Sequence, residues 1–147
     1  MEWVSRLHGK TVGLDTAPLI FYMEENPDFI DLVDAFFDDL IDGQFEVVTS
    51  TITLLEVLVH PIRNADEALA GQYNDILLSS PHVTTLPVTF ATAETAADLR
   101  AQHNLKTPDA IQLATALNAG AEFFLTNDRD FPGMAEIEIL KLRELRA

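Results

Sequence analysis

The sequence predicts an α/β domain in which helices cover both faces of a mainly parallel sheet of four to five strands. The first observation is an alternation of short runs rich in β-branched and aromatic residues with longer runs of helical periodicity. The second is their order, because strands that alternate with helices along a chain usually form a parallel sheet. The third is the size of the chain: 147 residues, 48% of them hydrophobic, are enough for one well-formed core.

The expected elements follow one another closely from residue 11 to residue 140. The strands are five short runs, at 11–15, 45–49, 83–86, 121–126 and 136–140. The helices are a short one that contains Pro18 in its first turn, followed by 28–42, 51–60, 64–79, 88–104 and 107–119. Residues 1–10 are an N-terminal extension, 11–140 a single domain, and 141–147 a tail that is helical or frayed.

Proline and glycine define several of the expected boundaries. Gly43 and Gly120 end helices, and Pro61 is expected to stop the helix that begins near Thr51. Thr107 followed by Pro108 reads as a cap and a first helical residue.

The composition excludes several classes of protein. The chain has no cysteine, which removes disulfide scaffolds, zinc–thiolate sites, iron–sulfur clusters and thiol nucleophiles. It has 9 Lys and Arg against 24 Asp and Glu, a net charge of −15, so it does not bind nucleic acid through a broad basic face. No apolar run approaches the ~20 residues that cross a bilayer and no signal peptide is visible, which predicts a cytoplasmic protein without membrane contact.

Acidic residues fall where the expected strands pass into helices. In an open parallel sheet these junctions are where binding sites form. The four acids are Asp15 at the end of the first strand, Glu56 in the helix after the second, Asp109 in the first turn of helix 107–119, and Asp128 just after the fourth strand. They are therefore expected at one edge of the sheet.

Each acid also has a purely structural interpretation. Asp15 and Asp128 suit the N-cap position of a helix, and Asp109 in a first turn suits the helix dipole. Thr53 and Glu56 match the spacing of a capping box. Taken together the four are harder to dismiss, because four carboxylates at one edge would repel one another. A hard divalent cation, which prefers oxygen ligands, is the natural counterweight.

The segments around these acids resemble a known family. TSTITLLEVLVHP, TPDAIQLATAL and LTNDRDF are similar to the three acidic motifs of PIN-domain nucleases, especially the VapC-like toxin ribonucleases. VGLDTAPLIFYME resembles the opening motif of that family, and the resemblance covers roughly residues 11–132. It implies a three-layer α/β/α PIN-like fold and a Mg²⁺- or Mn²⁺-dependent endoribonuclease, the toxin of a VapBC-type toxin–antitoxin system.

The resemblance also implies roles for individual residues. Asp15, Glu56, Asp109 and Asp128 are the catalytic and metal-binding quartet. Thr126 resembles a hydroxyl residue that supports the site, and Asp130 is an accessory acid or, alternatively, a cap of the FPG segment.

The expected reaction is hydrolysis of an RNA phosphodiester bond by a metal-activated water. Asp15 and Asp109 are expected to bind the metal directly, with Asp128 completing the site directly or through water. Glu56 is a further ligand or the general base. Lys106 and Arg129, which lie close to these acids in the sequence, are candidates to bind phosphate, although pairing with acidic neighbours is the alternative.

Two other functions remain open at this stage. A phosphotransferase could use Asp15 as a nucleophile, but Asp15-Thr16-Ala17 lacks the second aspartate of a DxD phosphatase. A catalytically silent PIN-like interaction module is the other.

The expected partners are an RNA substrate, a cognate antitoxin and a second copy of the chain. Apolar area for a homodimer would come from aromatic residues near the first two helices, which are Phe21, Tyr22, Phe29, Phe36 and Phe37. Packing in the core is an equally good use for most of them.

Overall fold

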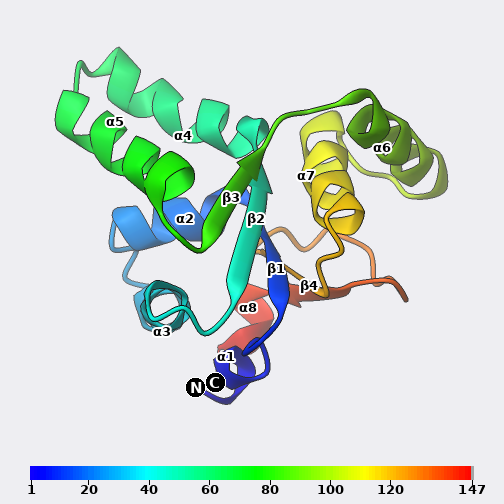
Figure 1. Cartoon of the computed structure of the whole chain (residues 1–147), viewed down its shortest axis with the longest axis horizontal. Coiled ribbons are helices and arrows are strands. Elements are labelled where there is room, and N and C mark those ends of the chain that lie inside the picture. The colour runs from blue at the N-terminus through cyan, green and yellow to red at the C-terminus, as the bar shows by residue number, and fades with distance from the viewer. Residues whose placement is uncertain (147) are drawn as a thin grey trace.

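The computed structural model, which describes residues 1–146, contains a five-stranded, fully parallel sheet (Figure 1). The sheet order is β3-β2-β1-β4-β5, with every neighbouring pair parallel. The strands are β1 (Thr11–Leu14), β2 (Glu46–Ser50), β3 (Val83–Leu86), β4 (Phe123–Thr126) and β5 (Glu138–Lys141). The predicted parallel sheet is confirmed, and helices on both faces complete a three-layer α/β/α fold.

The helices divide between the two faces of the sheet. The larger group is α1 (Glu2–Ser5), α2 (Thr16–Met23), α3 (Ile30–Ile41), α4 (Thr51–Arg63), α5 (Glu67–Asn74), the π-helical turn η1 (Asp75–Ser79) and α8 (Leu142–Leu145). The opposite group is α6 (Phe90–Gln102) and α7 (Thr107–Asn118). Figure 1 shows α2 to α5 on one side of the sheet and α6 with α7 on the other.

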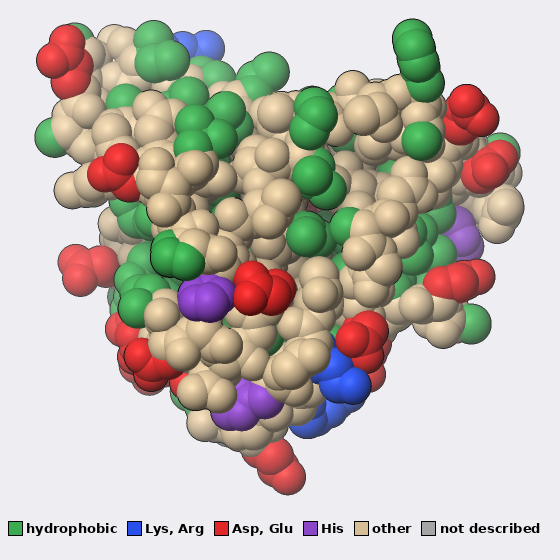
Figure 2. Space-filling model, viewed as in Figure 1, with side chains coloured by type: hydrophobic (Ala, Val, Ile, Leu, Met, Phe, Trp, Pro, Cys, Tyr) green, Lys and Arg blue, Asp and Glu red, His purple; other side chains and the backbone are tan. Residues whose placement is uncertain are grey.

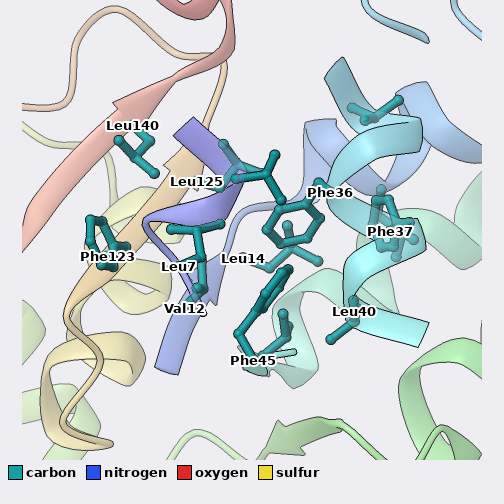
Figure 3. Close-up of a cluster of buried hydrophobic side chains, with 14 of the residues drawn as sticks. Leu7, Val12, Leu14, Phe36, Phe37, Leu40, Phe45, Phe123, Leu125 and Leu140 are labelled. Atoms are coloured by element: carbon teal, nitrogen blue, oxygen red, sulfur yellow. The ribbon is translucent and has the colours of Figure 1, made fainter. Parts of the chain in front are cut away.

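Two hydrophobic cores result from the alternation of side chains along each strand. On the larger side, Val12 and Leu14 of β1 join Leu125 of β4, and Phe36 and Phe45 close the cluster (Figure 3). On the other side, a second core forms around Phe124 of β4, Leu113 of α7 and Leu99 of α6. Both faces of the central strands are therefore buried, as expected for a parallel sheet.

Gly13 allows α7 to approach the sheet closely. A Cβ atom at this position would lie 2.5 Å from Cβ of Ala116 in α7 and 2.9 Å from Cδ1 of Phe124 in β4. A side chain of any size would therefore push α7 away from β1. Since α7 carries Asp109, this contact helps to set the position of that acid.

The chain differs from the sequence prediction at Pro61. The helix expected to stop there continues to Arg63, with Pro61 buried in its last turn. Proline at this point removes one helical hydrogen bond. The carbonyl of Pro61 still accepts a hydrogen bond, from the backbone N–H of Asp66 at 2.8 Å. Burial of the proline ring adds apolar contact, which offsets part of the loss.

Smaller differences concern where helices begin and which residue caps them; the helix expected from residue 28, for example, begins at Ile30. The helix expected from residue 64 begins at Glu67, after Asp66, whose side chain accepts a hydrogen bond from the N–H of Leu69. The helix expected from residue 88 begins at Phe90, after a Thr89–Thr92 capping box. Lys106, rather than Thr107, occupies the N-cap position of α7, and it makes no side-chain cap bond there.

Both ends of the described chain contribute to the larger core. Val4 and Leu7, in and just after α1, are fully buried, and so is Leu142 of α8. Figure 2 shows acidic side chains spread over the visible face, with Lys and Arg gathered at few points.

Within residues 1–146, none of the helices combines the length and apolar character that a membrane crossing requires.

Candidate active site

The topology places a crevice between the ends of β1 and β4. The chain runs outward from β1 to β2 and β3, and then returns to the other side of β1 to form β4. The carboxyl ends of two strands whose connections leave in opposite directions form the usual binding site of an open α/β sheet. Asp15 follows β1 directly, and Asp128 follows β4 by two residues.

Asp15 is a buried carboxylate held by two donors. Its Oδ1 accepts from the backbone N–H of Thr16 at 2.9 Å, and its Oδ2 accepts from Oγ1 of Thr126 at 2.7 Å. Burial raises the pKa of Asp15 to about 6; the bond from Thr126 opposes the rise, whereas the charges of Asp109 and Glu56 add to it. Asp15 is the N-cap of α2, as the structural interpretation proposed, but a cap alone does not require burial among other acids.

Asp128 lies in a turn rather than at the start of a helix. Its backbone N–H donates to Oγ1 of Thr126 at 3.0 Å, and its Oδ1 accepts from the N–H of Asp130 at 2.8 Å. The N-cap interpretation of Asp128 is therefore wrong, because no helix follows it. Thr126 supports two acids at once, since its hydroxyl donates to Asp15 and accepts from the backbone of Asp128.

Asp109 lies in the first turn of α7, half-buried. Burial raises its pKa, as do the charges of Asp128, Glu56 and, more weakly, Asp130, whereas Lys106 lowers it. The structure thus brings Asp109 into electrostatic contact with the acids from the other junctions.

Glu56 projects from α4 and is held by Thr16 of α2. Oγ1 of Thr16 donates to Oε1 of Glu56 at 2.6 Å. The capping-box interpretation of Thr53 and Glu56 is wrong, because the N-cap of α4 is Ser50, whose hydroxyl accepts from the N–H of Ile52 at 3.1 Å. Glu56 therefore lies well inside its helix and serves no cap.

A layer of buried polar side chains lies beneath Glu56. It contains Thr16, Thr49, Ser50, Thr53 and Gln112, and all five are buried. Sequence analysis did not identify Thr16 or Gln112 as parts of the site. The available signal was a glutamine at an inward-facing position of an otherwise apolar helix, in the segment TPDAIQLATAL.

An open pocket of about 660 Å³ joins Asp109, Asp128 and Asp130 to a basic wall. That wall contains Lys106 together with Arg100 and His103, which sequence analysis missed because they come from the end of α6 and the loop that follows it. Arg129 is not among the residues that line the pocket. Its backbone carbonyl instead accepts a hydrogen bond from Nζ of Lys141 at 2.9 Å.

The chemistry of these side chains fits a hard divalent cation. Within the described residues, no three acidic or histidine side chains are already gathered into a cation site. However, the charge of Glu56 raises the pKa of both Asp15 and Asp109, and Asp128 also raises the pKa of Asp109, so the four acids lie near one another. They offer anionic oxygen ligands, which Mg²⁺ and Mn²⁺ prefer.

The fold and these acids define a class: an α/β protein with a carboxylate site at the switch point of its sheet. The family model of the PIN domain matches residues 13–137, so the chain belongs to the PIN domain family. No curated protein matches the chain by sequence.

Solved structures of toxin–antitoxin proteins share the fold. VapBC2 from Rickettsia felis, bound to a promoter DNA fragment, matches with a TM-score of 0.67 and 15% identity over 89% of this chain and 98% of that one. A toxin–antitoxin complex from Klebsiella pneumoniae matches with a TM-score of 0.63 and 25% identity, over 90% of this chain and 97% of that one. Mycobacterium tuberculosis VapC20, a toxin that cleaves the sarcin–ricin loop, matches with a TM-score of 0.62 and 19% identity, over 84% of this chain and 90% of that one.

The family match supports a nuclease, and the solved structures share its fold. Nucleases of the PIN family generally use divalent metals.

Proposed function

We propose that this protein is a Mg²⁺- or Mn²⁺-dependent endoribonuclease and the toxin of a VapBC-type toxin–antitoxin pair. The observation that carries the proposal is that Asp15, Glu56, Asp109 and Asp128 lie close enough for their charges to interact, at the switch point of a PIN fold. The similar fold of VapC20, a toxin that cleaves the sarcin–ricin loop, supports RNA as the substrate. RNA as substrate also favours a cytoplasmic location.

Asp15 and Asp109 are the proposed direct metal ligands, and Asp128 completes the site. When bound, the ion supplies a water of lowered pKa and screens the charge of the scissile phosphate. Glu56, held by Thr16, is the proposed further ligand or the acceptor of the proton of the attacking water. Thr126 holds Asp15 and Asp128 beside each other through its hydroxyl group, and Asp130 adds negative charge at the pocket.

The basic wall of the pocket is the proposed contact for the RNA backbone. Nε of Arg100 donates to the carbonyl of Leu105 at 3.0 Å, which fixes the guanidinium at the pocket. Lys106 lies one turn before Asp109, close enough to lower the pKa of that acid. In a protein of net charge −15, local cations beside the acids are the means by which a phosphate can approach.

A second copy and an antitoxin are the proposed protein partners. Of the aromatic residues expected to supply apolar area for a dimer, Phe36 and Phe37 are buried in the core, whereas Phe21 and Phe29, stacked at 4.8 Å, are only partly buried. Three of the exposed large apolar side chains lie together on α4: Leu55, Val59 and Ile62. These residues are spaced to form one stripe along the helix.

The test is cleavage of total RNA by the purified protein with Mg²⁺, with Mn²⁺ and with a chelator. We expect cleavage only with metal, with 5′-phosphate and 3′-hydroxyl ends, and none from Asp109→Asn. Full activity in chelator would refute metal dependence, and 2′,3′-cyclic phosphate ends would refute attack by water.

The alternative is a catalytically silent PIN module, favoured by the absence of a gathered cation site among residues 1–146. Calorimetry decides between them. The silent module predicts neither cleavage of any RNA nor heat of binding with Mn²⁺.

A further inference from the structure

Gln112 connects the helix that carries Asp109 to the side chain that holds Glu56. It lies three residues after Asp109 in α7, with only 3% of its surface exposed. Its Nε2 donates to Oγ1 of Thr16 at 3.2 Å and to Oγ1 of Thr53, and its Oε1 accepts from Oγ of Ser50 at 2.6 Å.

The direction of every hydrogen bond in this layer follows from proton counting, because a hydroxyl has one proton and a primary amide has two. Thr49 donates its proton to the carbonyl of Leu14 at 2.8 Å, so its contact with Thr53 at 2.8 Å must be donated by Thr53. Thr53 then has no proton left for Thr16.

Thr16 is therefore left with one arrangement. Its oxygen accepts from Nε2 of Gln112, and its single proton points to Oε1 of Glu56. The same count fixes the orientation of the Gln112 amide: its nitrogen must face Thr53, whose proton is used towards Thr49, and its oxygen then accepts from the hydroxyl of Ser50.

We propose that Gln112 is a positioning residue, which acts through Thr16 to hold the Glu56 carboxylate in its working orientation. This inference rests on the proposed function, since it assumes that Glu56 takes part in the reaction. Glu56 is an exposed side chain with several free rotations, and one oriented hydroxyl removes much of that freedom. The second oxygen, Oε2, accepts no hydrogen bond from residues 1–146 and stays available to the site.

The same residue relates two acids from different helices. Asp109 and Gln112 lie on α7, whereas Glu56 lies on α4 and Thr16 on α2. The relay from Gln112 through Thr16 to Glu56 therefore couples the placement of Glu56 to that of Asp109. A purely structural glutamine would satisfy buried groups without any consequence for the reaction.

The test compares Thr16→Val, Thr16→Ser and Gln112→Leu with Thr115→Val. Thr115 is a matched control, because it is buried on α7 and its hydroxyl donates only to the carbonyl of Ile111 at 2.8 Å, within the helix. We expect Thr16→Val and Gln112→Leu to lower kcat and Mn²⁺ affinity about tenfold, as for the removal of a hydrogen bond to a charged group. Thr16→Ser should stay within about twofold of the wild type, as should Thr115→Val, because both keep the relay intact.

The decisive measurement is a double-mutant cycle with Glu56→Gln. If Thr16 and Gln112 act through Glu56, Thr16→Val should have no further effect on kcat or Mn²⁺ affinity in the Glu56→Gln background. Additive losses would overturn the positioning role, as would a Thr16→Val protein that matches Thr115→Val. The two Nε2 protons of Gln112, followed by NMR in metal-free protein, test the relay separately. We expect both to resist exchange in the wild type and one to lose protection in Thr16→Val.

The two proposals can fail separately. A wild-type protein that cleaves RNA while Thr16→Val is unimpaired overturns only the positioning role. A wild-type protein that neither cleaves RNA nor binds Mn²⁺ overturns the proposed function and the positioning role with it, even if the Gln112 protons are protected. If Gln112→Leu does not fold, Thr16→Val and Thr16→Ser still decide the question.

Discussion

The hydroxyl of Thr126 donates to Oδ2 of Asp15 at 2.7 Å and joins the ends of β4 and β1. Because Thr126 is fully buried and also accepts from the backbone of Asp128, it fixes the spacing of two acids. Thr126→Val should remove the donor while keeping the shape. We expect the free energy of unfolding of the metal-free protein at neutral pH to fall by about 1–3 kcal/mol.

The pH separates this effect from simple loss of packing. Near pH 5 the Asp15 carboxyl is largely protonated in the folded state, since its pKa lies at about 6, and the loss from Thr126→Val should be smaller. Thr126→Ser keeps the hydroxyl and should retain most of the stability. Equal losses for both variants at both pH values would contradict this account; urea unfolding measures all of them.

The raised pKa of Asp15 predicts that metal-free protein loses stability as pH rises. Asp15 has a pKa of about 6 in the folded state, against 3.8 for the unperturbed group. Between these values the unfolded chain releases the proton and the folded chain keeps it, so the free energy of unfolding falls with rising pH. Above about pH 6 the full cost applies, about 3 kcal/mol for a difference of about two pH units.

Asp15→Asn removes this titration. In chelator the variant and the wild type should have similar stability at pH 4, whereas the variant should be the more stable at pH 7.5. The other titrating groups are the same in both proteins, so their contribution cancels in the difference between the two free energies of unfolding. A constant difference across the pH range, measured by denaturant unfolding, would show that Asp15 is not strained by burial.

Asp109 distinguishes a metal site from a helix-dipole interaction. Its pKa is raised by burial and by Asp128 and Glu56, so Asp109→Asn should leave the melting temperature in chelator unchanged or raise it. A gain of about 1 kcal/mol corresponds to roughly 2–4 °C at this size. The same variant should lose most of the stabilisation that Mg²⁺ gives to the native state.

A helix-dipole role for Asp109 predicts the reverse. Loss of the charge would then cost some tenths of a kcal/mol, and the response to Mg²⁺ would be unaltered. Melting curves of both proteins with chelator and with Mg²⁺ measure the two effects. A destabilised metal-free variant with an unaltered Mg²⁺ response would refute the acidic site.

The order of elements could be predicted from the sequence because periodicity and helix signals are local. The positions of the four acids could be predicted for the same reason, because local patterns identify the strands that end before Asp15 and Asp128 and the helices that carry Glu56 and Asp109. Pro61 was misassigned because its tolerance depends on burial against distant residues. Gln112 and Thr16 were missed for a similar reason: Thr16 and Gln112 are 96 residues apart, and only tertiary packing brings them together.

The close approach of β1 and α7 at Gly13 predicts that any side chain at this position destabilises the protein. Gly13→Ala would place a Cβ 2.5 Å from Cβ of Ala116, so the helix must shift, at a cost of about 1–3 kcal/mol. Gly71→Ala is the control, because nothing lies within 4 Å of its Cβ position in α5. Alanine there should be neutral or stabilising. A Gly13→Ala protein as stable as the wild type, by urea unfolding, would contradict the close approach.

The basic wall of the pocket predicts which residues grip RNA. Lys106→Ala and Arg100→Ala should each raise the KM for RNA with little change in kcat. In the Asp109→Asn background, where cleavage is expected to be absent, each should weaken binding of single-stranded RNA, measured by fluorescence anisotropy. The dependence of log Kd on log salt should become shallower by about 0.7 for each phosphate that the variant no longer neutralises.

Lys10 is the matched control for these two residues. It precedes β1, at the opposite edge of the sheet from the acids, and it pairs with Glu122 at 3.2 Å. Lys10→Ala changes the net charge by the same amount as Lys106→Ala. If binding depends only on overall charge, all three variants should lose affinity equally. We expect Lys10→Ala to keep both the affinity and the salt slope of its parent, because the Debye length of ~8 Å at physiological salt screens a charge at that distance from the pocket.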